Sequence, residues 1–406
     1  MVHSSVCTGL TKDAMKIAFV VQRYGLEVSG GAELLCRQVV EHLVPEFEIE
    51  VLTTCAQDYV TWENTYPSGP DTVNGISVRR FPVLRTREDK FGKRSAWLYS
   101  QPHTLQDELD WLHAQGPVAP DLLRFIAEHR SEYAAFVFFT YIYYPTALGL
   151  RLVADRALLV PTAHDEPPIY LNMYKALFHS PRTIIYNTFE EKQLLEDLFG
   201  VEYIPNEVAG VGIDVPTQPD AEAFRRQHNI QTPYVVYVGR VSVSKSCDTL
   251  LDYFVRYKTA HPGPLTFVLV GQAEIPIPQR PDIVSLGFVS DEVKFNAIAG
   301  AELFLLPSKF ESLSIAFLES LAMGTPVLCE GTSAVLRGHC LRSNAALYYL
   351  NYPEFEASLE LLLANQRLRR SLGRRGKQYV KETFTWEKVV LKYRRLLTQT
   401  VKTPWW

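Results

Sequence analysis

The sequence predicts an α/β protein of two domains, each built around a parallel sheet. Its 406 residues exceed the length that one hydrophobic core usually serves, so we expect two domains of about 200 residues each. Short apolar runs alternate with longer amphipathic ones, which is typical of parallel α/β domains. The alternation starts again at Tyr234, after a proline-containing segment at residues 203–232 that reads as an interdomain linker. We therefore place the first domain at residues 15–210 and the second at residues 211–383.

The expected elements follow the chain in order. In the first domain we predict strands at residues 15–21, 49–53, 135–139, 157–161 and 183–186, and helices at 32–43 and 189–198. The second domain opens with a strand at 234–238 that enters Gly239. Next we predict a helix at 247–261. A strand then begins at residue 265 and runs into Gly271. A last amphipathic helix is expected at residues 384–400.

Composition and charge exclude several classes of protein. The formal net charge of −4 gives no overall attraction to nucleic acid, and the hydrophobic content of 47% excludes a disordered chain. The longest apolar run, residues 134–144, is too short to span a bilayer, so we expect at most peripheral membrane contact. The six cysteines form no Cys-x-x-Cys pair and no signal peptide precedes them, which favours a cytoplasmic protein. Residues 1–14 are expected to be a disordered extension.

Two glutamates, Glu311 and Glu319, bracket the most informative segment. An apolar run at residues 303–306 precedes them, a helix is predicted at 315–323, and a second apolar run follows at 326–328. Ser312 or Ser314 is expected to cap this helix and Gly324 to close it. The helix is apolar almost all round, so Glu319 needs a partner, either a protein donor such as a cap or an arginine, or ligand hydroxyls.

The spacing of the two glutamates argues against an acid and base pair. Eight helical residues span about 12 Å, whereas the carboxyls of a retaining hydrolase lie about 5 Å apart. Glu311 and Glu319 instead suit the two ends of one extended ligand.

The motif Glu311-x7-Glu319, followed by Ala322-Met323-Gly324-Thr325-Pro326-Val327, resembles the E-x7-E signature of the family 4 (group 1) retaining glycosyltransferases. The resemblance implies two Rossmann-like domains that face each other across a cleft (the GT-B fold), with residues 384–406 packing back on the first domain. It implies that Glu311 contacts hydroxyls of the donor sugar and that Glu319 binds the ribose of the nucleotide. The turn departs from the usual Glu-Gly-Phe-Gly. Its residues here are Ser312, Leu313 and Ser314, whose backbone amides we expect to face the donor.

A second group of residues follows the first strand of the second domain. Gly239 and Arg240 come directly after this strand, and Lys245 lies five residues further on. Ligands of doubly wound sheets bind outside the carboxyl ends of the strands, and two cations there suit a diphosphate. The resemblance implies the same role, while a solvated turn with ordinary surface cations is the alternative. The family reads the base largely through backbone groups, which points to Phe288 and Val289.

Three loops of the first domain supply further candidates. Gly30 and Gly31 precede a predicted helix, where either a close approach of a ligand or an ordinary tight turn would explain them. His164 and Asp165 follow a strand and are expected to orient acceptor or donor hydroxyls. Thr140 and Tyr141 stand where many family members carry a histidine. No metal is expected, because His164 lacks a second histidine at ligand spacing and no Asp-x-Asp motif occurs.

The basic stretch from Arg79 to Arg94 allows three readings. It can steer an anionic acceptor, contact a membrane surface, or form a solvated loop. No amphipathic apolar face accompanies the charges, which favours the loop.

The predicted function is transfer of a hexosyl group from a nucleoside diphosphate sugar to a hydroxyl of a carbohydrate, lipid-linked or small-molecule acceptor. The resemblance implies retention of anomeric configuration by a front-face mechanism, without metal or cofactor, and with Arg240, Lys245, Glu311 and His164 at the reacting groups. Two alternatives stay open. They are a nucleotide-sugar epimerase of the same fold and a non-catalytic, nucleotide-sugar-binding partner subunit.

Overall fold

The computed structural model describes residues 15–28 and 30–402. The expectation for residues 1–14 lies outside this range. The described chain divides into two compact units. The first holds the described residues of Met1–Val160, Asn172–Thr183 and Arg394–Trp406, and the second holds Pro161–Leu171 and Ile184–Tyr393. The predicted boundary at residues 210 and 211 falls inside the second unit, so that division of the chain stays a prediction.

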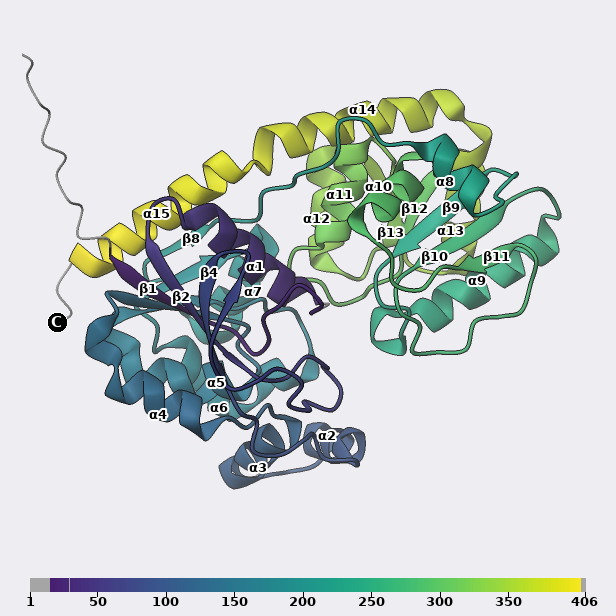
Figure 1. Ribbon diagram of the computed structural model, residues 1–406. Coiled ribbons are helices and arrows are strands. Elements are labelled where there is room, and N and C mark those ends of the chain that lie inside the picture. Colours follow the sequence, from purple (N-terminus) through teal and green to yellow (C-terminus); the bar gives the residue numbers. More distant parts are fainter. Residues whose placement is uncertain (1–14, 29, 403–406) are drawn as a thin grey trace, which may run out of the picture. The chain divides into compact units, whose positions relative to one another are not determined.

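The first unit is built on a largely parallel sheet (Figure 1). Its strands follow the order β3-β4-β2-β1-β5-β6. Their bounds are β1 Lys16–Val20, β2 Glu48–Thr54, β3 Gly69–Val73, β4 Ile76–Phe81, β5 Ala135–Phe139 and β6 Ala157–Val160. Strands β1 and β5 are fully or almost fully buried, as central strands covered on both faces should be. Asn74 and Gly75, both at positive φ, form the tight turn of the antiparallel β3–β4 hairpin.

Helices of the first unit connect and cover these strands. They are α1 Gly31–Leu43, α2 Phe91–Ser100, α3 Leu105–Gln115, α4 Pro120–Glu128, α5 Tyr144–Gly149 and α6 Asn172–Phe178. The last helix of the chain, α15 Trp386–Lys402, ends in this unit. There Arg394 lies 3.5 Å from Glu46 and the hydroxyls of Thr400 and Thr183 lie 3.1 Å apart. The final turns of α15 therefore pack on the first unit.

The second unit contains a sheet whose strand pairs are all parallel. The order is β11-β10-β9-β12-β13-β14, and Figure 1 shows α10 and α11 on one side of it and α9 on the other. The strands are β9 Tyr234–Val238, β10 Thr266–Val270, β11 Ile283–Ser285, β12 Leu303–Leu306, β13 Val327–Glu330 and β14 Ala346–Tyr349. A further parallel pair, β7 Thr183–Tyr186 with β8 Asn206–Val208, adjoins α7 Phe189–Phe199.

The helices of the second unit complete the alternation with its strands. They are α8 Ala221–Gln227, α9 Cys247–Ala260, α10 Asp291–Ala299, α11 Ile315–Met323, α12 Ala334–Ser343, α13 Tyr352–Ala364 and α14 Gln366–Thr383. Strand order reverses at β9, because β10 lies on one side of it and β12 on the other. Such a reversal opens a ligand-binding crevice at the carboxyl ends of two adjacent strands, here β9 and β12. Gly239 and Pro307 occupy those ends.

The predicted elements are confirmed where apolar runs are strong, and two expectations are wrong. Residues 203–232 are not all linker, because they contain β8 and α8. The basic stretch is not one solvated loop, since Arg79 and Arg80 lie on β4 and Arg80 is buried. Among the described residues, no helix combines the length and the apolar character needed to cross a membrane.

Candidate functional site

Three glycines bring the loops at the carboxyl ends of β9, β10 and β11 close together. Gly239 has a φ of 145° and Gly271 a φ of 135°, values that side-chain-bearing residues rarely adopt. A Cβ atom on Gly271 would lie 2.0 Å from the carbonyl oxygen of Gly239. The amide of Gly271 donates to the carbonyl of Gly287 at 2.8 Å. These loops therefore present tightly packed backbone at the edge where the site is predicted.

The two predicted cations, Arg240 and Lys245, both follow Gly239 in the loop between β9 and α9. Arg240 lies 3.5 Å from Glu274, and the hydroxyl of Tyr237 donates to the Arg240 carbonyl at 2.8 Å. Lys245 ends a short 3-10 turn before α9 and donates to Glu311 Oε1 at 2.8 Å. The Lys245 side chain remains 32% exposed. The fold thus joins two predicted site residues that lie 66 positions apart in the chain.

The turn between the two glutamates is held by its carbonyls. Ser314 has a φ of 67° and precedes α11, but its side chain forms no cap hydrogen bond, so the predicted serine cap is wrong for this residue. The hydroxyl of Thr188 donates to the Ser312 carbonyl at 3.1 Å. The His339 Nε2 atom lies 3.0 Å from the Leu313 carbonyl. The first amides of a helix have no partners within that helix, so those of α11 are of the kind that can bind a ligand.

His339 is fixed as a neutral ring. Its Nδ1 atom lies 3.0 Å from the Tyr379 hydroxyl, and its ring stacks on Phe317. Burial lowers the pKa of His339 to about 4, and Arg342 acts in the same direction. With Nε2 facing a carbonyl, the neutral ring carries its proton there and accepts from Tyr379.

Glu319 is buried in α11, as the sequence predicts, and its partner is a lysine. Lys294 of α10 donates to Glu319 Oε1 at 2.8 Å and lies 2.9 Å from Asp291 Oδ1. The Glu319 side chain is 9% exposed. Burial raises the pKa of Glu319, and Lys294 opposes that rise. The expectation of a cap or an arginine is therefore corrected to a lysine from the neighbouring helix.

The loop that carries His164 and Asp165 is fixed by a buried carboxylate. Glu191 accepts from the amides of Ala163 at 2.6 Å and Asn187 at 2.5 Å, and burial raises its pKa to about 8. His164 Nε2 lies 3.2 Å from Glu166, and Tyr170 donates to Asp165 at 2.7 Å.

The His164 ring also lies near the predicted donor turn. Its centroid is 5.7 Å from that of Phe310, the residue before Glu311.

In the first unit, the predicted glycines and hydroxyls have structural surroundings of their own. A Cβ on Gly30 would lie 2.2 Å from Glu33 Oε2, and Glu33 forms a buried pair with Arg23 at 2.6 Å. Gly31 begins α1 and has open space around its Cβ position. Gly30 is therefore required by the Arg23–Glu33 pair, whatever it binds.

Thr140 and Tyr141 follow β5. Thr140 has a φ of 69°, and its amide donates to the Val160 carbonyl at 2.9 Å. Tyr141 is fully buried, and its ring lies 4.9 Å from that of Tyr174 and 5.4 Å from that of Phe178. The Tyr141 side chain is thus a core residue of the first unit, although its assignment to the acceptor stays a prediction.

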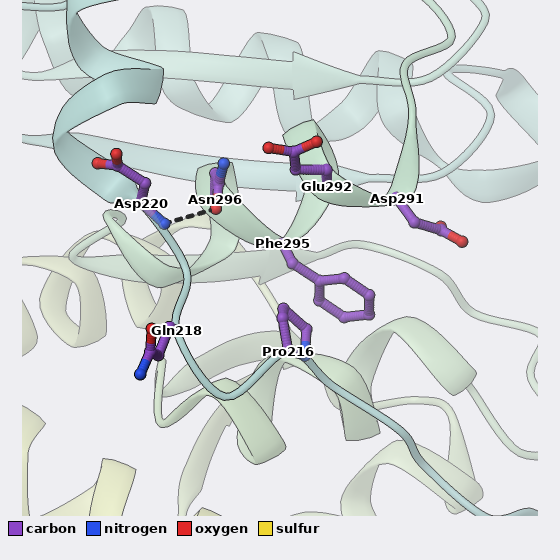
Figure 2. Close-up of a pocket in the computed structure, with 7 residues that line it drawn as sticks. All are labelled: Pro216, Gln218, Asp220, Asp291, Glu292, Phe295 and Asn296. Carbon is purple, nitrogen blue, oxygen red and sulfur yellow. Dashed lines mark hydrogen bonds between the residues drawn. The ribbon is translucent and has the colours of Figure 1, made fainter.

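Two hollows are lined by residues other than the predicted site residues. Figure 2 shows the first, of about 270 Å³, where the ring of Phe295 on α10 lies beside Pro216. Gln218, Asp291 and Glu292 also line it. The second, of about 640 Å³, lies in the first unit and is lined by charges of both signs, including Arg85, Arg94 and Asp110. Cations of the basic stretch are already paired. Arg94, which lines this hollow, lies 3.0 Å from Glu88, and Arg80 of β4 lies 2.7 Å from Asp71.

Comparison with known families decides what the second unit is. A family model described as glycosyl transferases, group 1, matches residues 232–363, the stretch that holds Gly239, Arg240, Lys245, Glu311 and Glu319. Residues 232–363 form a group 1 glycosyltransferase domain. The protein is accordingly a glycosyltransferase.

Similar proteins agree with this family. An uncharacterized glycosyltransferase of Methanocaldococcus jannaschii is 21% identical over 92% of this chain and 96% of its own length. A GDP-mannose-dependent α-(1-6)-phosphatidylinositol dimannoside mannosyltransferase of Mycobacterium tuberculosis is 31% identical over 44% of this chain and 48% of its own. The structure of HepE from Anabaena in complex with UDP-glucose has a TM-score of 0.69 and 16% identity, over 95% of this chain and 100% of HepE. The protein therefore has the two-Rossmann-domain glycosyltransferase fold.

Three residues of the glycosyltransferase were not found from its sequence. Lys294, His339 and Glu191 each act through packing between elements that lie far apart in the chain. Glu319 could be found because it is a charged residue inside an otherwise apolar helix. No comparable pattern marks its partner, Lys294.

Proposed function

We propose that this glycosyltransferase moves a hexosyl group from a nucleoside diphosphate sugar to an acceptor hydroxyl, with retention of anomeric configuration and without a metal ion. The second domain, residues 211–383, would bind the donor. The first domain, residues 15–210 with residues 384–406, would bind a carbohydrate, lipid-linked or small-molecule acceptor.

One observation carries the proposal. Lys245 and Glu311 meet at 2.8 Å beside the Gly239–Arg240 turn, at the carboxyl ends of β9 and β12. A lysine and an arginine at this edge suit the diphosphate, and the adjacent carboxylate suits the sugar hydroxyls. The name of one similar protein specifies GDP-mannose, and the structure of another is a complex with UDP-glucose. Both support a nucleoside diphosphate sugar and leave the base to experiment.

The reaction breaks the bond between the anomeric carbon and the diphosphate oxygen and forms a bond from the acceptor oxygen to the same face. The acceptor proton passes to the departing phosphate oxygen, so no protein nucleophile is needed. Arg240 and Lys245 would stabilise the charge that develops on the diphosphate, and such donors contribute about 3 to 4 kcal/mol each in other enzymes. Glu311 would orient the sugar, Glu319 the ribose, and His164 a hydroxyl near the turn.

The remaining assignments complete this donor site. Ser312, Leu313 and Ser314 would offer backbone groups to the sugar and phosphate, and Phe288 with Val289 would lie beside the base. We also assign Gly30 and Gly31 to donor binding. Thr140, Tyr141 and Asp165 are assigned to acceptor or sugar contacts. The cytoplasm is the proposed compartment, in keeping with the five described cysteines, which are free.

A panel of nucleotide sugars tests the proposal. Purified protein is incubated with UDP-, GDP- and ADP-hexoses and a mixture of acceptors, and product is followed by mass and its anomeric configuration by NMR. We expect one donor class to be consumed with formation of a glycoside that keeps the donor's configuration, with and without EDTA. Lys245→Ala should slow turnover at least about a hundredfold. Lys381→Ala, an exposed lysine of α14 in the same unit, is the matched control.

Other outcomes would contradict the proposal in distinguishable ways. Release of free nucleotide and an altered sugar without any acceptor would indicate the epimerase. Stabilisation by nucleoside diphosphates with no turnover over any acceptor would indicate the non-catalytic subunit.

A further inference from the structure

The environment of Glu319 contains a device that the E-x7-E motif does not include. Glu319 lies on a helix whose other residues are apolar or small, and its side chain is 9% exposed. A carboxylate in such surroundings must be paired or become protonated. The pairing comes from Lys294, which lies 25 positions earlier on α10.

The ammonium group of Lys294 contacts two carboxylates, those of Glu319 and Asp291. Its Nζ atom lies 2.8 Å from Glu319 Oε1 and 2.9 Å from Asp291 Oδ1, one turn earlier on α10. The Lys294 side chain is 15% exposed, whereas that of Asp291 is 83% exposed. The ammonium is therefore held between a buried carboxylate and a solvated one, and Figure 2 shows Asp291 at the start of α10 beside the neighbouring hollow.

The contact uses one oxygen of the carboxylate. Lys294 Nζ forms a single charged hydrogen bond to Glu319, and it is to Oε1. A carboxylate has acceptor capacity on both oxygens, so Oε2 stays available to hydroxyl donors. We propose that Lys294 is a positioning residue of the donor site, which fixes Glu319 through Oε1 and so presents Oε2 to the ribose hydroxyls of the nucleotide. The proposal rests on the proposed function, because it takes Glu319 as the ribose-binding residue.

The charges around Glu319 give Lys294 a second effect. Lys294 and Asp291 are the charged groups of α10 that act on Glu319. Helix α14 also packs on α11, and its Lys377 lies against Gly324, at the far end of α11. Burial lowers the pKa of Lys294, but Glu319 and Asp291 more than reverse this, so the lysine stays charged. Without that charge Glu319 would take up a proton more readily and lose part of its capacity to accept from hydroxyls.

The test compares ribonucleotides with 2′-deoxyribonucleotides. The full chain is titrated calorimetrically with UDP, GDP and ADP and with their 2′-deoxy forms, and the base that the parent binds most tightly is used throughout. We expect the parent to prefer the ribonucleotide by about tenfold, since a hydrogen bond to a charged group is lost in the deoxy form. Lys294→Met should bind both forms alike, with the ribonucleotide falling to the level of its deoxy form. Lys294→Arg, which keeps a charge, should retain part of the preference.

Controls separate this positioning role from a structural one. Lys381→Met removes an exposed lysine of the same unit and should keep the parent's preference. If Lys294→Met folds poorly, the double variant Lys294→Met with Glu319→Gln removes the unpaired buried charge. It should regain melting temperature and still bind the two forms alike.

Two results would overturn the inference alone, and a third would instead contradict the proposed function. The parent preference persisting in Lys294→Met or in the double variant would show that Lys294 positions nothing. A parent that binds nucleoside diphosphates without any ribose preference would remove the role of Glu319 and leave the donor class standing. A parent that binds none of the three nucleoside diphosphates would contradict the proposed function itself.

Discussion

Two lysine–glutamate ion pairs with the same N–O distance have different surroundings and, we infer, different roles in this protein. Lys245–Glu311 and Lys294–Glu319 both join at 2.8 Å. In the first pair Lys245 is 32% and Glu311 13% exposed, and the pair lies in loops. In the second, Lys294 is 15% and Glu319 9% exposed, and the pair joins two helices. Exposed pairs contribute little to stability and exchange partners readily, while a buried pair is costly to break. We infer that the first pair opens to bind ligand and that the second stays closed.

The largest expected effect comes from breaking the more exposed pair, Lys245–Glu311. Lys245→Met should lower kcat at least about a hundredfold, because a donor to the departing diphosphate is lost. Its free energy of unfolding should change by less than about 1 kcal/mol. Turnover and urea unfolding of the same preparation check both halves. If the variant lost stability as strongly as activity, the role of Lys245 would be structural.

Breaking the buried pair should have the reverse pattern. Lys294→Met leaves Glu319 unpaired, so we expect unfolding free energy to fall by about 3 kcal/mol or more. Glu319→Gln added to it should restore part of the loss, which a double-mutant cycle by urea unfolding measures. Unchanged stability of Lys294→Met would show that the pair is not closed in solution.

The same variant should gain a pH dependence of a defined sign. With Lys294 gone, burial raises the pKa of Glu319 without opposition, so the folded state holds a proton that the unfolded state releases. Stability relative to the parent should therefore fall as pH rises from 5 to 8. Melting temperatures across that range check it, and a deficit that grows toward low pH would contradict it.

His339 connects the two devices, because it holds the turn between Glu311 and Glu319. The pKa of His339 is about 4 in the folded protein, below the ordinary value of 6.5. Between pH 4 and pH 6.5 the unfolded chain therefore binds a proton at this histidine that the folded protein does not. This residue should cost the parent about 2 kcal/mol of stability between pH 7 and pH 5. His339→Gln should flatten that dependence in pH-resolved unfolding, and an unchanged slope would assign the titration to other groups.

The smallest effect concerns the outer anchor of Lys294. Asp291 is 83% exposed, so Asp291→Asn should lower stability by less than about 0.5 kcal/mol. It should reduce the ribose preference less than Lys294→Met does. Glu292→Gln, which removes the adjacent exposed acid of the same helix, is the matched control in both assays.

The sequence predicted most of the strands and helices around the site and few of the contacts within it. Residues 303–306 and 315–323 were assigned correctly because these strong apolar runs end at Pro307 and Gly324. The β3–β4 hairpin was missed although Asn74-Gly75 signals it. Lys294 could not be assigned, since nothing in its local pattern says that α10 packs against α11. The same holds for His339, whose partner carbonyl lies 26 positions away.

The central claim is that the two pairs hold two parts of one nucleotide, and one titration series tests it. Affinities of the ribonucleoside diphosphate, its monophosphate and its 2′-deoxy form are measured on Lys245→Met and Lys294→Met. We predict that Lys245→Met loses the preference for diphosphate over monophosphate and keeps the preference for ribose, and that Lys294→Met shows the opposite. Loss of both preferences in both variants would contradict the account.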